Sequence, residues 1–221
     1  MIEINDLQFR YQQGDFSLNI PHLSVKKAAK VAIVGASGCG KTTLLHLISG
    51  IKVPNQGSIQ IDSVNLEKLN DRDRRQWRIT NIGFIFQDFE LIDYLNVLDN
   101  ILHCYRLNSA LKLTKEVKDN AYYLAEKAGI ADKIKRSINQ VSQGEKQRIA
   151  ICRALLTHPK LLLADEATGN LDPANKQRIM DILSSYLEEH QATLIAVTHD
   201  YELLNSFDKV VDFKQFYIPE K

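Results

Sequence analysis

The sequence has no apolar run long enough to cross a membrane as a helix. Hydrophobic residues make up 44% of its 221 residues and charged residues 25%, and no apolar stretch approaches the roughly 18 residues of a membrane span. Residues 1–6 include an early acid and lack the basic start of a signal peptide. These absences predict a chain that is made in the cytoplasm, stays there, and reaches a membrane only through a partner.

An excess of charge and a cysteine framework are also missing. The 28 Lys and Arg residues nearly balance the 27 Asp and Glu residues, which leaves a net charge of +1 and no electrostatic footprint for nonspecific binding of nucleic acid. The three cysteines, Cys39, Cys104 and Cys152, have neither disulfide nor metal-ligand spacing. We therefore expect reduced thiols and no nucleic-acid partner.

The apolar patterns that are present predict an α/β protein with two lobes. Alternating apolar residues between positions 2 and 20 predict strands of an antiparallel sheet. Short apolar runs at 31–34, 161–164 and 194–197 predict buried parallel strands. Because both halves of the chain are needed to close one sheet, we expect a single domain over residues 1–221. Its predicted parts are a core with an antiparallel β subdomain, about 1–87 and 157–221, and an inserted helical subdomain, about 88–156.

A glycine-rich loop follows the first buried run. Residues 35–42 match the pattern G-x-x-x-x-G-K-[ST] at every fixed position. In such a loop the backbone N–H groups wrap the phosphates of a nucleotide, and the next helix adds the positive end of its dipole. A chance glycine-rich turn would not explain why a strand precedes this loop and a helix follows it. The predicted ATP-binding residues are Gly35, Ala36, Ser37, Gly38, Cys39, Gly40, Lys41, Thr42 and Thr43, with Lys41 on the β- and γ-phosphates and Thr42 on Mg²⁺.

Two acids close the second buried run. Asp165 and Glu166 follow the apolar residues 161–164, although acids are normally excluded from buried strands. Taken alone, this pattern is equally typical of a strand that runs into a polar loop, but α/β proteins bind ligands at this end of their strands. With the phosphate loop upstream, we expect Asp165 to hold the Mg²⁺ shell and Glu166 to take a proton from the attacking water.

A third motif, residues 141–148, resembles the L-S-G-G-Q signature of the ABC ATPase family. It reads V-S-Q-G-E-K-Q-R and precedes the acidic strand, as in that family. Tyr11, Gln87, the segment 170–172 and His199 match further family motifs in the expected order. The resemblance extends over essentially the whole chain. It implies a P-loop ATPase core with an antiparallel β subdomain and an inserted helical subdomain.

The resemblance also implies roles for individual residues and for a second copy of the chain. Two subunits would pair head to tail, with each ATP between the phosphate loop of one copy and the signature of the other. An integral-membrane permease would receive the resulting motion. The implied residues are Glu166, His199 and Gln87 for catalysis, Thr42, Gln87 and Asp165 for Mg²⁺, Tyr11 for adenine, and Ser142, Gln143, Gly144, Glu145 and Asp172 for ATP across the dimer.

Two signature positions depart from the family pattern. Gln143 stands where the first glycine is usual, and Glu145 stands where a glutamine is usual. Gly144, which is expected to contact phosphate through its backbone, is kept. We therefore expect activity to survive, and any effect of Gln143 to fall on the fit or on the partner contact.

Residues 77–87 are similar to the ATPases of the lipoprotein-release and macrolide-export group. Asp93 and Asn96 stand where that group usually has proline and threonine. The group implies ATP hydrolysis that powers export or extraction of a substrate at the cytoplasmic face of the membrane. The alternative is a cell-division-type ATPase that drives a membrane partner without moving cargo. Nontransport relatives with two ATPase halves or a long coiled coil do not match, because this chain has one half and no sustained heptads.

The segment 89–95, directly after Gln87, mixes large apolar residues with acids. A docking surface needs apolar anchors with a polar rim, so we predict that this segment receives a helix of the membrane partner. The alternative is that its apolar residues pack inside the helical lobe. Substitutions at Leu91 and Tyr94 separate the two interpretations.

Overall fold

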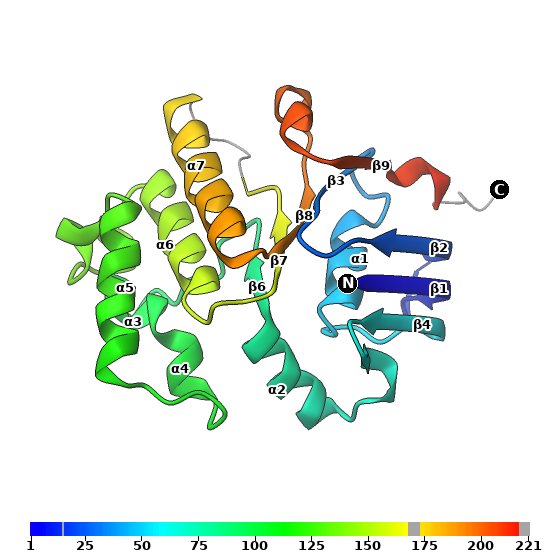
Figure 1. Ribbon diagram of the computed structural model, residues 1–221, viewed down its shortest axis with the longest axis horizontal. Coiled ribbons are helices and arrows are strands. Elements are labelled where there is room, and N and C mark those ends of the chain that lie inside the picture. Colours follow the sequence, from blue (N-terminus) through cyan, green and yellow to red (C-terminus); the bar gives the residue numbers. More distant parts are fainter. Residues whose placement is uncertain (15, 168–172, 217–221) are drawn as a thin grey trace.

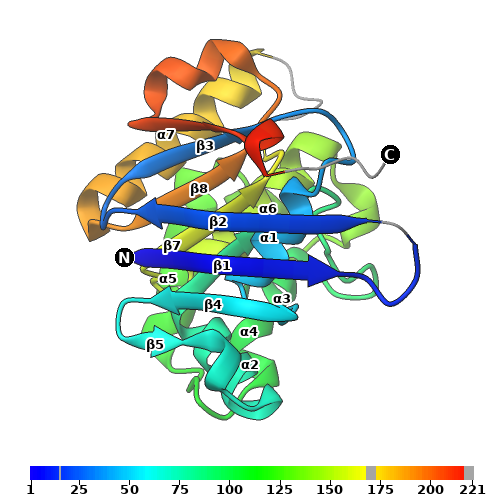
Figure 2. The same cartoon turned by 90° about the vertical axis from the view of Figure 1, so that its right-hand side faces the viewer.

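The chain folds around two sheets that face each other across one helix. The computed structural model describes residues 1–14, 16–167 and 173–216. The first sheet is antiparallel, with the order β2-β1-β4-β5, and it faces the viewer in Figure 2. Its strands are β1 (Ile2–Arg10), β2 (Ser17–Val25), β4 (Gln56–Ile61) and β5 (Val64–Asn65).

The second sheet is parallel and has the order β6-β7-β8-β3-β9. Helix α1 (Lys41–Ile48) lies between the two sheets (Figure 1), and its apolar residues share one core with both of them. Every residue of β6, β7 and β8 is buried, as expected for strands covered on both faces. The strands are β3 (Lys30–Val34), β6 (Ile82–Ile85), β7 (Leu161–Asp165), β8 (Thr193–Val197) and β9 (Lys209–Asp212).

Helices α3 to α6 form a lobe to the left of the parallel sheet in Figure 1, whereas α7 packs beside the sheet and α2 lies below it. Helix α6 joins this lobe to the sheet, because Ile149 and Cys152 belong to the helical core while Ile151 and Leu155 belong to the core beside the sheet. The helices are α2 (Asp71–Asn81), α3 (Val97–Ile101), α4 (His103–Leu107), α5 (Lys115–Lys127), α6 (Gln143–Leu155) and α7 (Pro173–His190). Short 3₁₀ turns occur at Leu66–Lys68, Ala131–Lys133, Ile138–Gln140, Tyr201–Ser206 and Phe213–Gln215.

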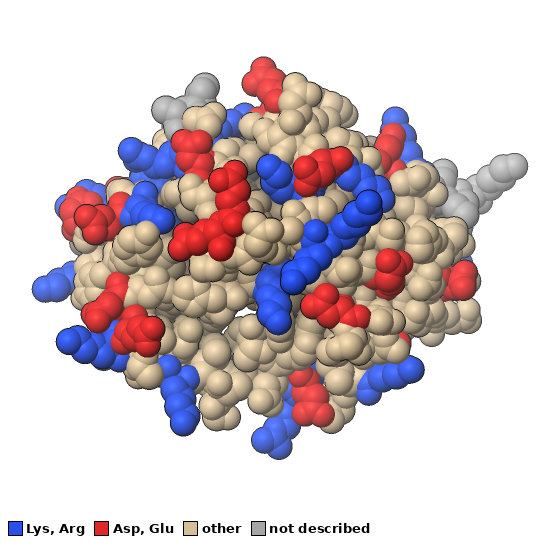
Figure 3. Space-filling view, viewed as in Figure 1, with Lys and Arg blue, Asp and Glu red and all other residues tan. Residues whose placement is uncertain are grey.

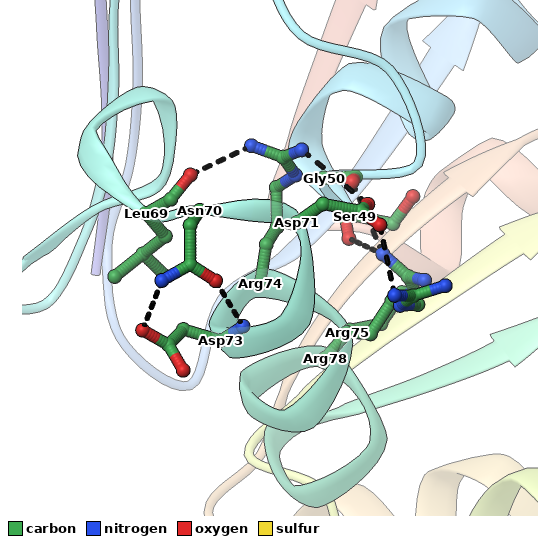
Figure 4. A network of polar contacts seen from close by, with 9 residues as sticks. All are labelled: Ser49, Gly50, Leu69, Asn70, Asp71, Asp73, Arg74, Arg75 and Arg78. Carbon is green, nitrogen blue, oxygen red and sulfur yellow. Dashed lines mark hydrogen bonds and ion pairs between the residues drawn. The ribbon is translucent and has the colours of Figure 1, made fainter.

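Helix α2 is polar and has no fully buried residue; Trp77 packs against the core, and its arginines bind neighbouring backbone carbonyls (Figure 4). Asn70 caps it by accepting from the backbone N–H of Asp73 at 2.9 Å. Arg78 donates from Nη1 to the carbonyls of Ser49 and Gly50, at 3.3 and 3.1 Å. These two carbonyls follow the last turn of α1, so α2 is tied to the end of the helix that starts at the glycine-rich loop.

The structure confirms the predicted fold class and corrects its detail. The three predicted parallel strands are β3, β7 and β8, but β6 and β9 complete the sheet and were not recognised as strands. Helices α3 to α6 lie between β6 and β7 in the chain; the exact subdomain boundaries stay a prediction. No helix among the described residues is long and apolar enough to span a membrane. Charges of both signs are interspersed on the face shown in Figure 3.

Candidate nucleotide-binding and hydrolysis site

The glycine-rich loop joins the buried strand β3 to α1, and its backbone conformation requires glycine. Gly40, the residue before the helix, has φ 105°, a region that side chains rarely adopt. A Cβ atom at this position would lie 2.5 Å from the ring of Phe16. The loop therefore packs against Phe16, the residue directly before β2.

Lys41 is held inside the loop. Its ammonium donates to the carbonyls of Gly35 and Ala36, at 2.9 and 2.8 Å, and the residue is only 5% exposed. The loop thus keeps a positive charge at its centre, with the N-terminal end of α1 directly behind it. Both features attract the phosphates of a nucleotide.

Asp165 ends strand β7 with an unpartnered carboxylate oxygen. It is 4% exposed, and its Oδ1 atom has no hydrogen-bond partner. Burial raises the pKa of Asp165 above its ordinary value, while a hydrogen bond with Thr42 acts in the opposite direction. A buried carboxylate beside a hydroxyl provides oxygen ligands of the kind that Mg²⁺ prefers, so the residues present fit this ion.

Glu166 turns out of the strand toward His199. Its φ is 50°, and its backbone N–H donates to the carbonyl of Val197 at 3.0 Å. Strands β7 and β8 are neighbours, so their ends bring the two side chains together. The Nε2 atom of His199 lies 3.0 Å from Oε1 of Glu166. This geometry fixes the direction of a carboxylate that is itself partly accessible, as a general base requires.

Residues of the glycine-rich loop and Glu166 line one cavity of about 450 Å³. Gln87, which follows β6, is exposed and lies on its wall. Tyr11 also lines the cavity, with its hydroxyl 2.9 Å from Oγ1 of Thr43 and its ring 5.6 Å from that of Phe16. The lining residues are Tyr11, Phe16, Ser37, Gly38, Gly40, Lys41, Thr42, Thr43, Gln87 and Glu166.

The signature residues lie on a different part of the molecule, at the start of α6. Ser142 caps this helix, because its hydroxyl accepts from the N–H of Glu145 at 3.3 Å while the Glu145 carboxylate accepts from the N–H of Ser142 at 2.7 Å. Glu145, one of the two departures from the signature, thus completes a capping box. Ser142 and Gln143 are exposed, and none of the residues 142–145 belongs to the described lining of the cavity.

Comparison with known proteins decides the family. The model of the "ABC transporter" family matches residues 18–169. The chain belongs to this family. It is 36% identical to the macrolide export ATP-binding/permease protein MacB of Rhodopirellula baltica, over 100% of this chain but only 33% of that protein. It is also 36% identical to the lipoprotein-releasing system ATP-binding protein LolD of Colwellia psychrerythraea, over 97% of this chain and 84% of that protein.

Solved structures of ABC proteins share the fold over nearly the whole chain. The dimeric post-hydrolysis structure of the ATP-binding cassette MJ0796 with ADP and Pi has a TM-score of 0.88 and 30% identity, over 96% of this chain and 94% of that chain. The structure of cbiO1 from Clostridium perfringens, part of the transporter complex cbiONQ, has a TM-score of 0.82 and 26% identity, over 98% and 86%. The reaction of this ABC protein is ATP hydrolysis.

The structure brings most of the predicted site residues of this ABC protein together. The cavity collects the glycine-rich loop, Tyr11, Gln87 and Glu166, with Asp165 behind Thr42 and His199 behind Glu166. It keeps the signature residues apart, and Asp172 lies outside the described residues. Phe16 was missed because no motif contains it; its ring reaches Gly40 only once β2 has folded over the loop. The individual roles of these residues stay predictions.

Proposed function

We propose that the chain is the ATP-binding and ATP-hydrolysing subunit of a membrane ABC transporter, and that it works as a head-to-tail homodimer. One observation carries the proposal: the cavity holds the phosphate loop, Gln87 and Glu166, whereas Ser142 stands exposed at the start of a helix outside that cavity. A helix N-terminus is suited to bind phosphate. A second copy can bring its Ser142 and Gly144 to the γ-phosphate, so ATP joins the two copies.

Within each site, the proposed role of each residue follows from the chemistry of its side chain. Lys41 and the loop N–H groups bind the phosphates, and Tyr11 stacks on the adenine. Thr42, Asp165 and Gln87 hold Mg²⁺, which when bound neutralises phosphate charge. Glu166 accepts a proton from the attacking water, and His199 keeps its carboxylate in position through the 3.0 Å contact.

The names of the relatives support an export or extraction role. LolD is a lipoprotein-releasing ATP-binding protein, and MacB combines ATP-binding and permease parts in one chain. For the present chain we infer an integral-membrane permease as the partner and a peripheral position at the cytoplasmic face of the membrane. Hydrolysis would then open the dimer and move the permease.

The segment 89–95, which is predicted to dock on this permease, contains both a partly buried and an exposed apolar residue. Leu91 is partly buried and packs against the core of the helical lobe, so the alternative interpretation holds for this residue. Tyr94 is 87% exposed and keeps its role as a candidate anchor. A largely apolar cavity of about 360 Å³ has Phe86, Leu107 and Arg153 on its wall. Because Arg153 binds the backbone carbonyls at the start of the segment, this cavity adds apolar surface for a partner helix.

Purification of the tagged chain from detergent-solubilised membranes tests the proposal. We expect one integral-membrane protein to copurify, and the ATPase rate to rise when that protein and its substrate are supplied in vesicles. Stimulation without movement of any substrate would support the cell-division-type alternative. Failure to copurify with any membrane protein would contradict the proposed function.

A further inference from the structure

Helix α6 contacts the chain on both sides of Gln87. Before Gln87, strand β6 lies so close to α6 that a Cβ atom at Gly83 would be 2.5 Å from the carbonyl oxygen of Ala154. This is a contact that only glycine permits. After Gln87, the guanidinium of Arg153 donates from Nη2 to the carbonyl of Phe89 at 2.5 Å and from Nη1 to the carbonyl of Glu90. Helix α6 thus contacts the backbone both before Gln87, at Gly83, and after it, at Phe89 and Glu90.

The two hydrogen bonds from Arg153 stabilise an unfavourable backbone conformation at Phe89 and Glu90. Phe89 and Glu90 have φ values of 63° and 48°, and two successive non-glycine residues in the left-handed region persist only where their surroundings hold them. Arg153 is 8% exposed. Burial lowers its pKa, and Cys104 and Glu90 partly offset this effect. A buried guanidinium whose fork matches two successive carbonyls is a specific arrangement that a lysine cannot reproduce.

The other end of the same helix carries the signature. Ser142 caps α6, and Arg153 lies eleven residues later, about 16 Å along the helix axis. Between them Ile149 and Cys152 pack into the helical core while Ile151 packs beside the sheet. The helix is therefore a stiff connection between Ser142 and the exit of the Gln87 segment.

We propose that Arg153 is a positioning residue that makes the Gln87 segment and the Ser142 end of α6 move as one body. This inference rests on the proposed function, which places Gln87 at the nucleotide of its own subunit and Ser142 at the nucleotide of the partner. When ATP draws Gln87 inward, α6 carries Ser142 with it, and docking of Ser142 on a second copy fixes Gln87 in return. Nucleotide binding at one site thereby changes the position of the binding residues at the other site.

The test is a double-mutant cycle that joins Arg153→Met to Gln87→Ala. Methionine fills the buried space without the two hydrogen bonds. We expect Arg153→Met to bind ATP within about twofold of the wild type, because the phosphate loop is untouched, and to lower kcat about tenfold with little change in KM. Since Arg153 acts through Gln87, adding Gln87→Ala should cause little further loss.

Arg78→Met is the matched control. Arg78 also donates to two successive carbonyls, those of Ser49 and Gly50 (Figure 4), but these belong to the end of α1. Its loss should lower the melting temperature, yet Gln87→Ala should keep its full effect in that background. A purely structural role for Arg153 would make the two arginine variants behave alike, with multiplicative losses in both cycles, and would overturn the inference.

Hydrogen exchange on the wild-type protein provides a second readout if Arg153→Met does not fold. Amides in residues 86–92 and 141–146 should gain protection together, over the same range of Mg-ATP concentration. A response of one segment without the other would overturn the inference. If Gln87→Ala alone left kcat unchanged, the failure would lie in the proposed function and would remove the basis of the inference as well.

Discussion

Replacement of Asp165 by asparagine tests two effects of its carboxylate: its contribution to ATP turnover and its cost to the stability of the folded protein. Its Oδ1 atom is buried without a hydrogen-bond partner, and a buried polar atom in this state costs about 1–3 kcal/mol. The hydrogen bond with Thr42 and the charge of Lys41 offset part of that cost. Asparagine leaves a polar atom in the same place, so this cost remains, but it removes the buried charge, which burial disfavours. We therefore expect Asp165→Asn to stabilise the nucleotide-free protein by about 1 kcal/mol. For a chain of this size, that is a rise of about 2–4 °C in Tm.

The pH dependence of the gain follows from the direction of the pKa shift. Burial raises the pKa of Asp165 in the folded state, so folding disfavours the charged form. The stability penalty is absent at low pH, where the carboxyl is protonated, and it develops as pH rises through the folded-state pKa. The advantage of Asp165→Asn should accordingly be small in acid and complete at neutral pH.

Thermal melting in EDTA, from acid to neutral pH, measures this advantage, and the exposed Asp93→Asn is the control that should not shift Tm. Turnover with Mg-ATP should fall about 10²-fold in Asp165→Asn, the scale for removal of one group that stabilises developing charge. An unchanged or lower Tm at neutral pH would show that the charge of Asp165 does not destabilise the folded protein, and would refute the reasoning.

Two further substitutions test the loop and the docking surface. Gly40→Ala should lower ATP affinity more than tenfold in a binding titration, because the new Cβ would lie 2.5 Å from the ring of Phe16 and the left-handed backbone adds about 1–2 kcal/mol of strain. Gly14→Ala is the control: Gly14 has φ 90° and no atom within 4 Å of a Cβ, so this variant has the backbone strain alone and should bind ATP normally. Tyr94→Asp should leave stability within about 0.5 kcal/mol but abolish stimulation by the permease, whereas Leu91→Asp should melt early. Normal ATP affinity in Gly40→Ala, or full stimulation in Tyr94→Asp, would contradict these assignments.

Short-range signals were sufficient to predict the centre of the fold. The apolar run 31–34, the glycine-rich loop and the helix after it form one continuous unit, β3 to α1, so local spacing determines their order in space. Asp165 and Glu166 were also predictable, because acids that end an apolar run indicate the carboxyl edge of a sheet. The contact between Glu166 and His199 was not predicted; it arises because the strands that precede these residues, β7 and β8, are neighbours.

Long-range packing was not predictable in the same way. β6 is a four-residue strand containing Gly83, and its apolar run was recognised only as the approach to Gln87. Phe16 reaches Gly40, and Arg153 reaches the carbonyls of Phe89 and Glu90, only after distant segments have folded together. A lone arginine in a helix otherwise has the appearance of a surface residue. No spacing rule indicates which carbonyl a buried guanidinium will bind.

The mass in solution of Glu166→Gln, with and without Mg-ATP, tests the central claim most directly. Removal of the general base should reduce turnover about 10²–10⁴-fold while ATP binding persists, so the ATP-joined dimer accumulates. The account predicts a monomer of 25.2 kDa without nucleotide and a particle of twice that mass with it. Addition of Ser142→Arg should return the protein to a monomer that still binds ATP. A Glu166→Gln protein that binds ATP and stays monomeric, or that hydrolyses ATP at the normal rate, would contradict the account.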